Sequence, residues 1–452
     1  MYYLSLKFCS ETGGKTEKRR NNKMKTYGIV SEYNPFHNGH KYQIEETKKQ
    51  TGADHIVAVM SGNYVQRGDV AVIDKFKRAQ IAVQNGVDLV LELPVPYTLT
   101  NAQTFARASV FMLNALGVVD GISFGSECGD LDLLKNAAVA AAAVSVPEKV
   151  KPLLEEGESY PSAVQKLVNS EYGPMVGEVF NSPNNILAVE YLKAIADFKK
   201  SDTAGREKAI EEAKSKGEEI DESKFPEVRE LEAFTVKRTA SHDSEETAEG
   251  KFASASAIRR MIEDGEDFSA YVPAETLAAI NEYDDKDHLC YFDNLERELL
   301  YRMRTVSPQD LAQLADVDEG LVNRMFQVGR VAVSLEDLIN GVKTKRYPEA
   351  RIRRLLLCAL LGIRKNELQT PPPFGRILAL NERGTEILSE AKGKARMVFG
   401  TSLKAIADMD NQLFKHFAAM SSITSDVYGL ASRDIRPCGV DFTTAVNVIK
   451  NN

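Results

Sequence analysis

Two histidines separated by two residues, His37 and His40, form an H-x-G-H motif directly after the apolar run 27–30. Gly39 lies between them, and a glycine permits close approach of the backbone to a ligand. A helical stretch follows, and the free N–H groups at its start favour an anion. Imidazoles supply hydrogen-bond donors that can follow charge developing on a phosphate during a displacement. We interpret the motif as a phosphate-handling site, with a structural helix cap as the alternative. A metal site is less favoured, because no third ligand lies nearby.

A second motif, S-x-S-x-I-R, occupies residues 254–259 and contains Ser254, Ser256 and Arg259. Serines that cap a helix, followed by an arginine in its first turns, make a terminal-phosphate site. In isolation the motif would favour an ordinary capped surface helix. Its pairing with H-x-G-H favours the functional interpretation.

The elements that must position these motifs alternate from Met24 onward. Short apolar runs separated by helical segments indicate parallel strands with crossover helices. Sheets of this kind place ligands beyond the carboxyl ends of their strands, where both histidines lie. The predicted strands are 27–30, 55–60, 87–93 and 118–124, and the predicted helices are 41–50, 75–84, 102–116 and 131–146.

Composition limits the classes of protein to which this chain can belong. The chain has 452 residues, of which 43% are hydrophobic and 27% charged, which is typical of a globular protein of roughly three domains. No apolar stretch approaches the ~20 residues of a membrane span. The net charge of −8 restricts any nucleic-acid contact to a local patch. The five cysteines include no C-x-x-C pair, which indicates a reducing compartment and favours the cytoplasm.

Three segments differ from this alternating pattern. Residues 1–23 carry six basic and two acidic side chains, and we expect a disordered extension. Residues 199–224 contain seven basic and eight acidic residues and predict a solvated helical or flexible insertion. From about residue 273 the pattern becomes helical with few strand signals.

A basic segment, residues 343–354, holds six basic residues, one acidic residue and Tyr347. Basic charge beside an aromatic side chain suits a nucleic-acid backbone, so we favour RNA binding over a solvated helix face. Arg376 is a weaker companion.

The two phosphate motifs resemble those of the nucleotidylyltransferase superfamily, whose members attack the α-phosphate of ATP and release pyrophosphate. Six longer motifs point to one family within this superfamily. They are E-Y-N-P-F-H-N-G-H, S-G-N-Y-V-Q-R-G (61–68), D-L-V-L-E-L-P (88–94), F-G-S-E (124–127), S-P-N-N-I-L (182–187) and K-T-K-R-Y (343–347). In this order they are similar to the tRNA(Met) cytidine acetate ligase family, from Met24 nearly to the C-terminus.

That resemblance implies an enzyme that uses ATP to join acetate to the exocyclic amine of the wobble cytidine of elongator tRNA(Met), through an acetyl-adenylate. Mg²⁺ is expected with the ATP. The implied fold is α/β: a Rossmann-like parallel sheet in an ATP-binding domain (24–270), followed by a mostly helical tRNA-binding region (271–452). The alternatives are an adenylyltransferase for a small metabolite and a non-catalytic tRNA-binding protein.

The resemblance also assigns residues. The ATP loop corresponds to Val30, Ser31, Glu32, Tyr33, Asn34, Pro35, Phe36, His37, Asn38, Gly39, His40, Lys41, Tyr42 and Gln43. Further ATP contacts are expected from Gly125, Asn184 or Asn185, Arg238, Ser254, Ser256 and Arg259. Lys75 and Arg78 join the histidines as candidate catalytic phosphate ligands, with a solvated helix face as the alternative. The expected tRNA contacts are Lys343, Lys345, Arg346, Tyr347, Arg351, Arg353, Arg354 and Arg376.

Overall fold

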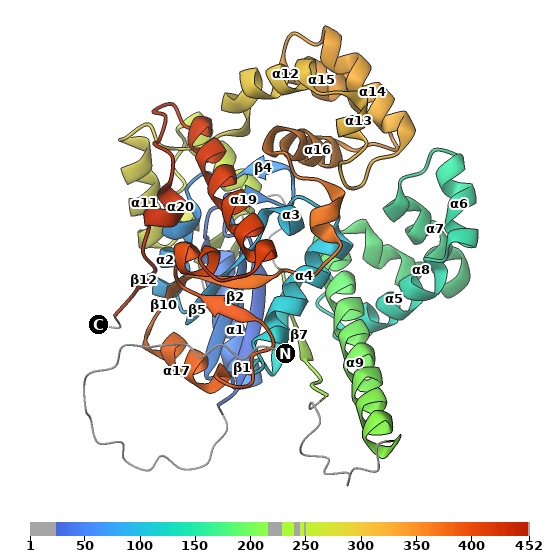
Figure 1. Cartoon of the computed structure of the whole chain (residues 1–452), viewed down its shortest axis with the longest axis vertical. Coiled ribbons are helices and arrows are strands. Elements are labelled where there is room, and N and C mark those ends of the chain that lie inside the picture. The colour runs from blue at the N-terminus through green and yellow to red at the C-terminus, as the bar shows by residue number, and fades with distance from the viewer. Residues whose placement is uncertain (1–23, 216–227, 239–244, 248–249, 451–452) are drawn as a thin grey trace.

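A computed structural model describes residues 24–215, 228–238, 245–247 and 250–450 (Figure 1). The predicted extension (1–23) and residues 216–224 of the predicted insertion lie outside the described residues.

An eight-stranded sheet forms the centre of the molecule, with seven strands in the order β11-β10-β5-β2-β1-β6-β7 and β12 paired with β10. Five strands run parallel: β1 (Thr26–Ser31), β2 (His55–Ser61), β5 (Leu89–Leu93), β6 (Gly121–Ser126) and β7 (Glu232–Lys237). The predicted α/β fold is therefore confirmed, with a mixed sheet in which most strands are parallel. The strand expected at 118–124 begins three residues later, at Gly121.

Helices bury both faces of this sheet, as β2 illustrates. Ile56, Ala58 and Met60 belong to a core shared with helices α1 (Asn38–Thr51), α2 (Lys75–Gln84), α10 (Ala255–Asp264) and α11 (Ala274–Asp284). Val57 and Val59 point into a second core with α4 (Ala102–Ala115), α5 (Leu131–Val144), α9 (Pro183–Ser215) and α19 (Gln412–Tyr428). A strand buried on both faces is the expected companion of parallel crossovers.

A third core belongs to a group of helices that lies apart from the sheet (Figure 1). Its helices are α12 (Glu296–Thr305), α13 (Pro308–Leu311), α14 (Glu319–Val331), α15 (Leu335–Val342) and α16 (Glu349–Leu361). A small hairpin, β3 (Tyr64–Val65) and β4 (Asp69–Val70), adds Tyr64 and Val70 to this core. The hairpin thus joins the sheet to the helical group.

The mostly helical region 271–452 also supplies three strands that the sequence analysis did not predict. β10 (Phe374–Leu380) runs antiparallel to β5, and β11 (Val398–Gly400) and β12 (Asn447–Val448) run parallel to β10. The run F-G-R-I-L-A-L is buried throughout, but its partner β5 lies far away in the sequence, so no local pattern indicates the pairing.

The predicted insertion is helical as far as Ser215, because α9 continues through it without a break. Figure 1 shows the second half of α9 projecting from the body of the molecule. In the described part of the chain, no helix is both long and apolar enough to cross a bilayer.

Candidate active site

The H-x-G-H histidines lie where β1 meets α1, with their rings stacked at a centroid distance of 3.8 Å. His37 caps the helix: its Nδ1 accepts from the backbone N–H of Gly39 at 3.1 Å. His40 reaches back, and its Nδ1 accepts from the backbone N–H of His37 at 3.2 Å. A Cβ on residue 39 would stand 2.9 Å from the His37 ring, so glycine is required for this folded-back arrangement.

This geometry fixes the protonation of the pair. Burial, with the charges of Arg238 and Arg259, lowers the pKa of His37 to about 3. Burial and the neighbouring His37 also hold the pKa of His40 well below its ordinary value. A neutral imidazole whose Nδ1 accepts carries its proton on Nε2. No described residue hydrogen-bonds to either Nε2, so the motif presents two free N–H donors from uncharged rings.

The S-x-S-x-I-R motif lies against this loop. Ser254 caps α10, its Oγ accepting from the N–H of Ala257 at 3.1 Å. Arg259 Nη1 donates to the carbonyl of Asn34 at 2.7 Å, and its Nη2 to Ser256 Oγ at 3.4 Å. Asn38 Nδ2 donates to the carbonyls of Lys251 and Ala270, both at 3.0 Å. Two motifs more than 200 residues apart therefore form one site.

The loop after β6 carries a second group of predicted ATP contacts. Asn185 is buried at the start of α9, and its Oδ1 accepts from the backbone N–H groups of Glu127 and Cys128 at 2.9 and 3.2 Å. The Glu127 carboxylate accepts from Asn184 Nδ2 at 2.7 Å and from the backbone N–H of Asn185 at 2.9 Å. Arg238, immediately after β7, lies against Gly125. Burial lowers the pKa of the Arg238 guanidinium, and Glu127 opposes that effect. The sequence analysis quoted Glu127 within F-G-S-E but assigned it no role.

The rest of the ATP loop divides into buried and half-buried parts. Four consecutive side chains of the loop are buried and anchor it to the protein: Tyr33, Asn34, Pro35 and Phe36. Asn34 Oδ1, for example, accepts from the N–H of Val72 at 2.9 Å. Lys41 is exposed, and the remaining loop side chains are half-buried: Val30, Ser31, Glu32, Tyr42 and Gln43. Gln43 Nε2 donates to the Ser123 carbonyl at 3.4 Å.

Arg78 neither lies on a solvated helix face nor is open to a phosphate, the two interpretations that the sequence left. It is fully buried and donates to the carbonyls of Ile73, Glu32, Ser61 and Gly62. Its guanidinium therefore ties the ATP loop to the end of β2. In this structure Arg78 is a positioning residue.

Lys75 and Arg376 are also misassigned, because both lie inside the protein. Lys75 Nζ contacts Glu92 Oε1 at 2.6 Å and Asp441 Oδ2 at 2.9 Å. Arg376 donates to the side chain of Asp441, and its Nη2 to the Asp441 carbonyl at 2.7 Å. Burial by itself would raise the pKa of Asp441, but Lys75 and Arg376 outweigh it and hold that pKa below its ordinary value. We call these four residues the buried ion cluster; it leaves neither cation available to ATP or RNA.

The basic segment is less free than its sequence indicates. Lys343 pairs with Glu349, Lys345 with Glu158 and Arg346 with Asp318, at 2.8, 2.7 and 3.3 Å. Tyr347 is buried, and its hydroxyl donates to Asp318 at 2.9 Å. Three further arginines face the protein: Arg351 binds the Asp316 carbonyl, Arg353 the Gly68 carbonyl and Arg354 the Gln66 carbonyl. The first three cations remain substantially exposed, at 48%, 77% and 39% of their side chains, and are the surface that RNA could reach.

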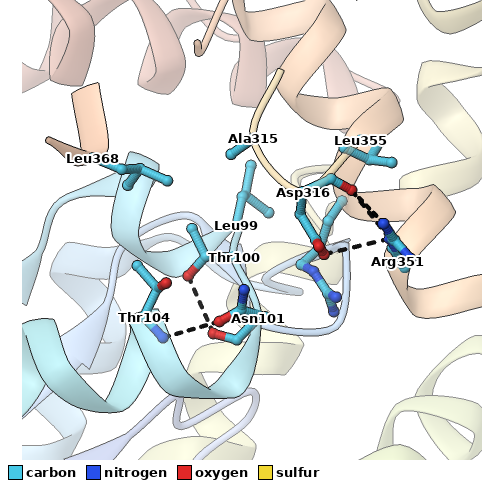
Figure 2. A pocket seen from close by; sticks show the side chains of 10 residues that line it. Leu99, Thr100, Asn101, Thr104, Ala315, Asp316, Arg351, Leu355 and Leu368 are labelled. Atoms are coloured by element: carbon cyan, nitrogen blue, oxygen red, sulfur yellow. Dashed lines mark hydrogen bonds and ion pairs between the residues drawn. The ribbon is translucent and has the colours of Figure 1, made fainter. Parts of the chain in front are cut away.

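A cavity of about 190 Å³ lies between the start of α4 and helix α16. Figure 2 shows the side chains that line it. Thr100, Asn101 and Thr104 line one side, and Asp316 and Arg351 the other. A second cavity, of about 410 Å³, lies between α1 and the start of α11. Neither is lined by His37 or His40. Within the described residues, no three His, Cys, Asp or Glu side chains converge to hold a metal ion.

Comparison with known proteins finds matches over nearly the whole chain. The family model of the HIGH Nucleotidyl Transferases matches residues 24–215 and 226–436. The tRNA(Met) cytidine acetate ligase of Thermoanaerobacter sp. (strain X514) is 34% identical over 428 residues, 92% of this chain and 97% of that protein. The ligase of Acetivibrio thermocellus is 30% identical over 446 residues, 94% and 100% of the two chains.

A solved structure, Thermotoga maritima TmcAL bound with alpha-thio ATP, superposes with a TM-score of 0.79. It is 28% identical, and the match covers 95% of this chain and all of that one. The chain thus belongs to the HIGH nucleotidyl transferase family and, within it, to the tRNA(Met) cytidine acetate ligases.

Proposed function

We propose that this protein is an ATP-dependent ligase that acetylates the exocyclic amine of the wobble cytidine of elongator tRNA(Met), through an acetyl-adenylate. The observation that carries the proposal is the neutral, stacked histidine pair, in a chain that matches named acetate ligases over nearly its whole length. Free N–H donors on uncharged rings can stabilise charge that develops on a phosphate without exchanging a proton with it.

In the first step, an acetate oxygen attacks the α-phosphorus of ATP. The new O–P bond forms as the bond to the β-phosphate breaks, and pyrophosphate leaves. Such a displacement needs positioning and charge stabilisation rather than a covalent protein nucleophile. The Nε2–H groups of His37 and His40 and the guanidinium of Arg238 supply these donors, while Asn185 and Arg259 hold the two loops in place.

In the second step, the cytidine amine attacks the carbonyl carbon of the acetyl-adenylate. A C–N bond forms, the bond to the adenylate oxygen breaks, and AMP and a proton leave. The exposed cations of the basic segment, Lys343, Lys345 and Arg346, are the proposed contacts for the tRNA backbone.

Magnesium would enter with ATP. This ion is commonly bound by substrate phosphates together with one or two carboxylates, and not by an all-protein cage. We also place the protein in the cytoplasm, where elongator tRNA and ATP occur; the described cysteines, Cys128, Cys290, Cys358 and Cys438, are all free thiols.

The test is incubation of the protein with ATP, radiolabelled acetate and total tRNA, followed by nucleoside analysis. We expect label in acetylcytidine from elongator tRNA(Met) alone, with AMP and pyrophosphate released. Label on a small metabolite, or ATP consumption that is independent of acetate, would instead indicate an adenylyltransferase. Binding of tRNA without ATP consumption would indicate a non-catalytic protein.

A further inference from the structure

The turn between β3 and β4 presents an arginine that the sequence analysis left unassigned. Gln66, Arg67 and Gly68 form this turn, closed by a hydrogen bond from the N–H of Gly68 to the Val65 carbonyl at 3.0 Å. Gly68 has a φ of +77°, and a Cβ there would stand 2.5 Å from the backbone nitrogen of Arg354. Helix α16 therefore packs directly onto the turn.

The turn is fixed from two sides. Toward the ATP loop, the backbone N–H of Gln66 donates to Glu32 Oε1 at 2.6 Å. The Gln66 side chain donates to the carbonyl of Thr100, just before α4, at 3.0 Å. Toward the helical group, Arg354 donates to the Gln66 carbonyl at 3.1 Å and Arg353 to the Gly68 carbonyl at 3.0 Å. The turn is thus a rigid support between the two regions.

Arg67 projects from this support into solvent. No hydrogen bond or ion pair joins its guanidinium to any residue in the described part of the chain. Its charge nevertheless acts on the site. Burial raises the pKa of the Glu32 carboxyl, and Arg259, Arg67 and Arg78 oppose that rise. Arg67 also repels Arg238.

An unpaired cation that repels Arg238 costs electrostatic energy unless an anion binds beside them. The H-x-G-H motif lies on one side of this turn, and the basic segment, which ends within helix α16, lies on the other. An arginine on the rigid turn between them is preorganised for a phosphate oxygen, which a guanidinium binds through a charge-assisted hydrogen bond.

We propose that Arg67 binds a substrate phosphate beside the ATP loop that carries the H-x-G-H motif. The assignment rests on the proposed function for its substrates. The phosphate belongs either to the adenylate moiety or to the RNA backbone beside the reacting cytidine. Separate measurements distinguish these two sources.

The test compares Arg67→Ala and Arg67→Lys with Arg260→Ala. Arg260 is the matched control, because it is an exposed arginine of α10 with no hydrogen bond or ion pair to any described residue. The first measurement is the Kd of ATP by calorimetry, which requires neither acetate nor tRNA. The second is the Kd of elongator tRNA(Met) at several salt concentrations, together with single-turnover acetyl transfer.

Loss of one charge-assisted hydrogen bond predicts about 10- to 100-fold weaker binding for Arg67→Ala, with partial recovery in Arg67→Lys. Weaker ATP binding assigns the adenylate phosphate; weaker tRNA binding with a shallower salt dependence assigns the RNA phosphate. Wild-type affinity for both ligands, as in Arg260→Ala, would overturn the proposal. Thermal melting checks that Arg67→Ala is folded. If the wild-type protein binds ATP but acetylates no tRNA, the proposed function fails while the ATP measurement still tests Arg67.

Discussion

Two regions at the carboxyl ends of the parallel strands concentrate positive charge, and they use it in opposite ways. In the buried ion cluster, Lys75 and Arg376 are neutralised by Glu92 and Asp441 within direct contact distance. In the H-x-G-H site, Arg238 and Arg67 form no ion pair with any described residue, and the histidines are uncharged. A cation with a buried carboxylate partner is held within the fold; one left without a partner beside a phosphate motif is available to a ligand.

The largest expected effect removes the carboxylate shared by the two buried cations. Asp441→Ala leaves Lys75 and Arg376 without it, and breaking a buried ion pair typically costs about 3–5 kcal/mol. We expect a loss of this size in the free energy of unfolding, measured by urea denaturation. Asp434→Ala is the control, because that side chain is 73% exposed. A loss below about 1 kcal/mol would show that the cluster is not structural.

The second prediction concerns the histidines. His40→Ala removes one preorganised N–H donor, which typically costs 10²–10³-fold in rate. We expect that loss in acetate-dependent exchange of pyrophosphate into ATP, with little change in the melting temperature. His416→Ala, at a half-exposed histidine far from the motif in the sequence, controls for histidine loss. Near-normal acetyl-adenylate formation by His40→Ala would refute the assignment.

A third variant tests whether cations that are paired but exposed are still available to a ligand. Lys343, Lys345 and Arg346 all have acidic partners yet remain accessible. Replacing all three with Ala should weaken tRNA binding and reduce its salt slope by up to about three, near 0.9 per lost phosphate contact. Pyrophosphate exchange should not change. Unaltered tRNA affinity at moderate salt would make the segment a solvated face.

The smallest effect is on the pH dependence of stability. Both histidines have depressed pKa values in the folded protein, so they stay neutral there while the unfolded chain takes up protons below its ordinary histidine pKa of ~6.5. Stability should therefore fall as the pH drops from 7 to 5.5, by about 1 kcal/mol per histidine. A variant with both His37→Gln and His40→Gln should show a shallower fall in urea denaturation. Identical slopes would mean that the pair is protonated in the folded state.

The sequence predicted the H-x-G-H loop and its parallel strands because residues close together in the sequence determine both. Strand, turn and helix follow one another within 26–51, and the glycine lies between the two histidines it allows to stack. The resemblance to a known family added Asn185 and Arg238, which local patterns do not single out. In the structure the charge of Arg238 acts on His37, and Asn185 contacts the loop after β6.

The sequence was misleading where partners come from far away. Lys75 and Arg376 resemble solvent-facing cations until Asp441, 366 residues from Lys75, is placed between them. Tyr347 and Lys345 find their acidic partners at Asp318 and Glu158. Charge density along the chain says nothing of such pairing, so it overestimates how much of a basic segment is free.

The contact between Gly68 and α16 limits how this protein could be recombined with its relatives. The two-residue strands of the hairpin place Tyr64 and Val70 inside the core of the helical group, although the hairpin is encoded between β2 and α2. The helical group therefore cannot be exchanged between relatives as one continuous segment of the chain. A chimaera that exchanges residues 290–361 between two relatives would have to exchange residues 62–72 with them, because the surface of one was shaped around the other.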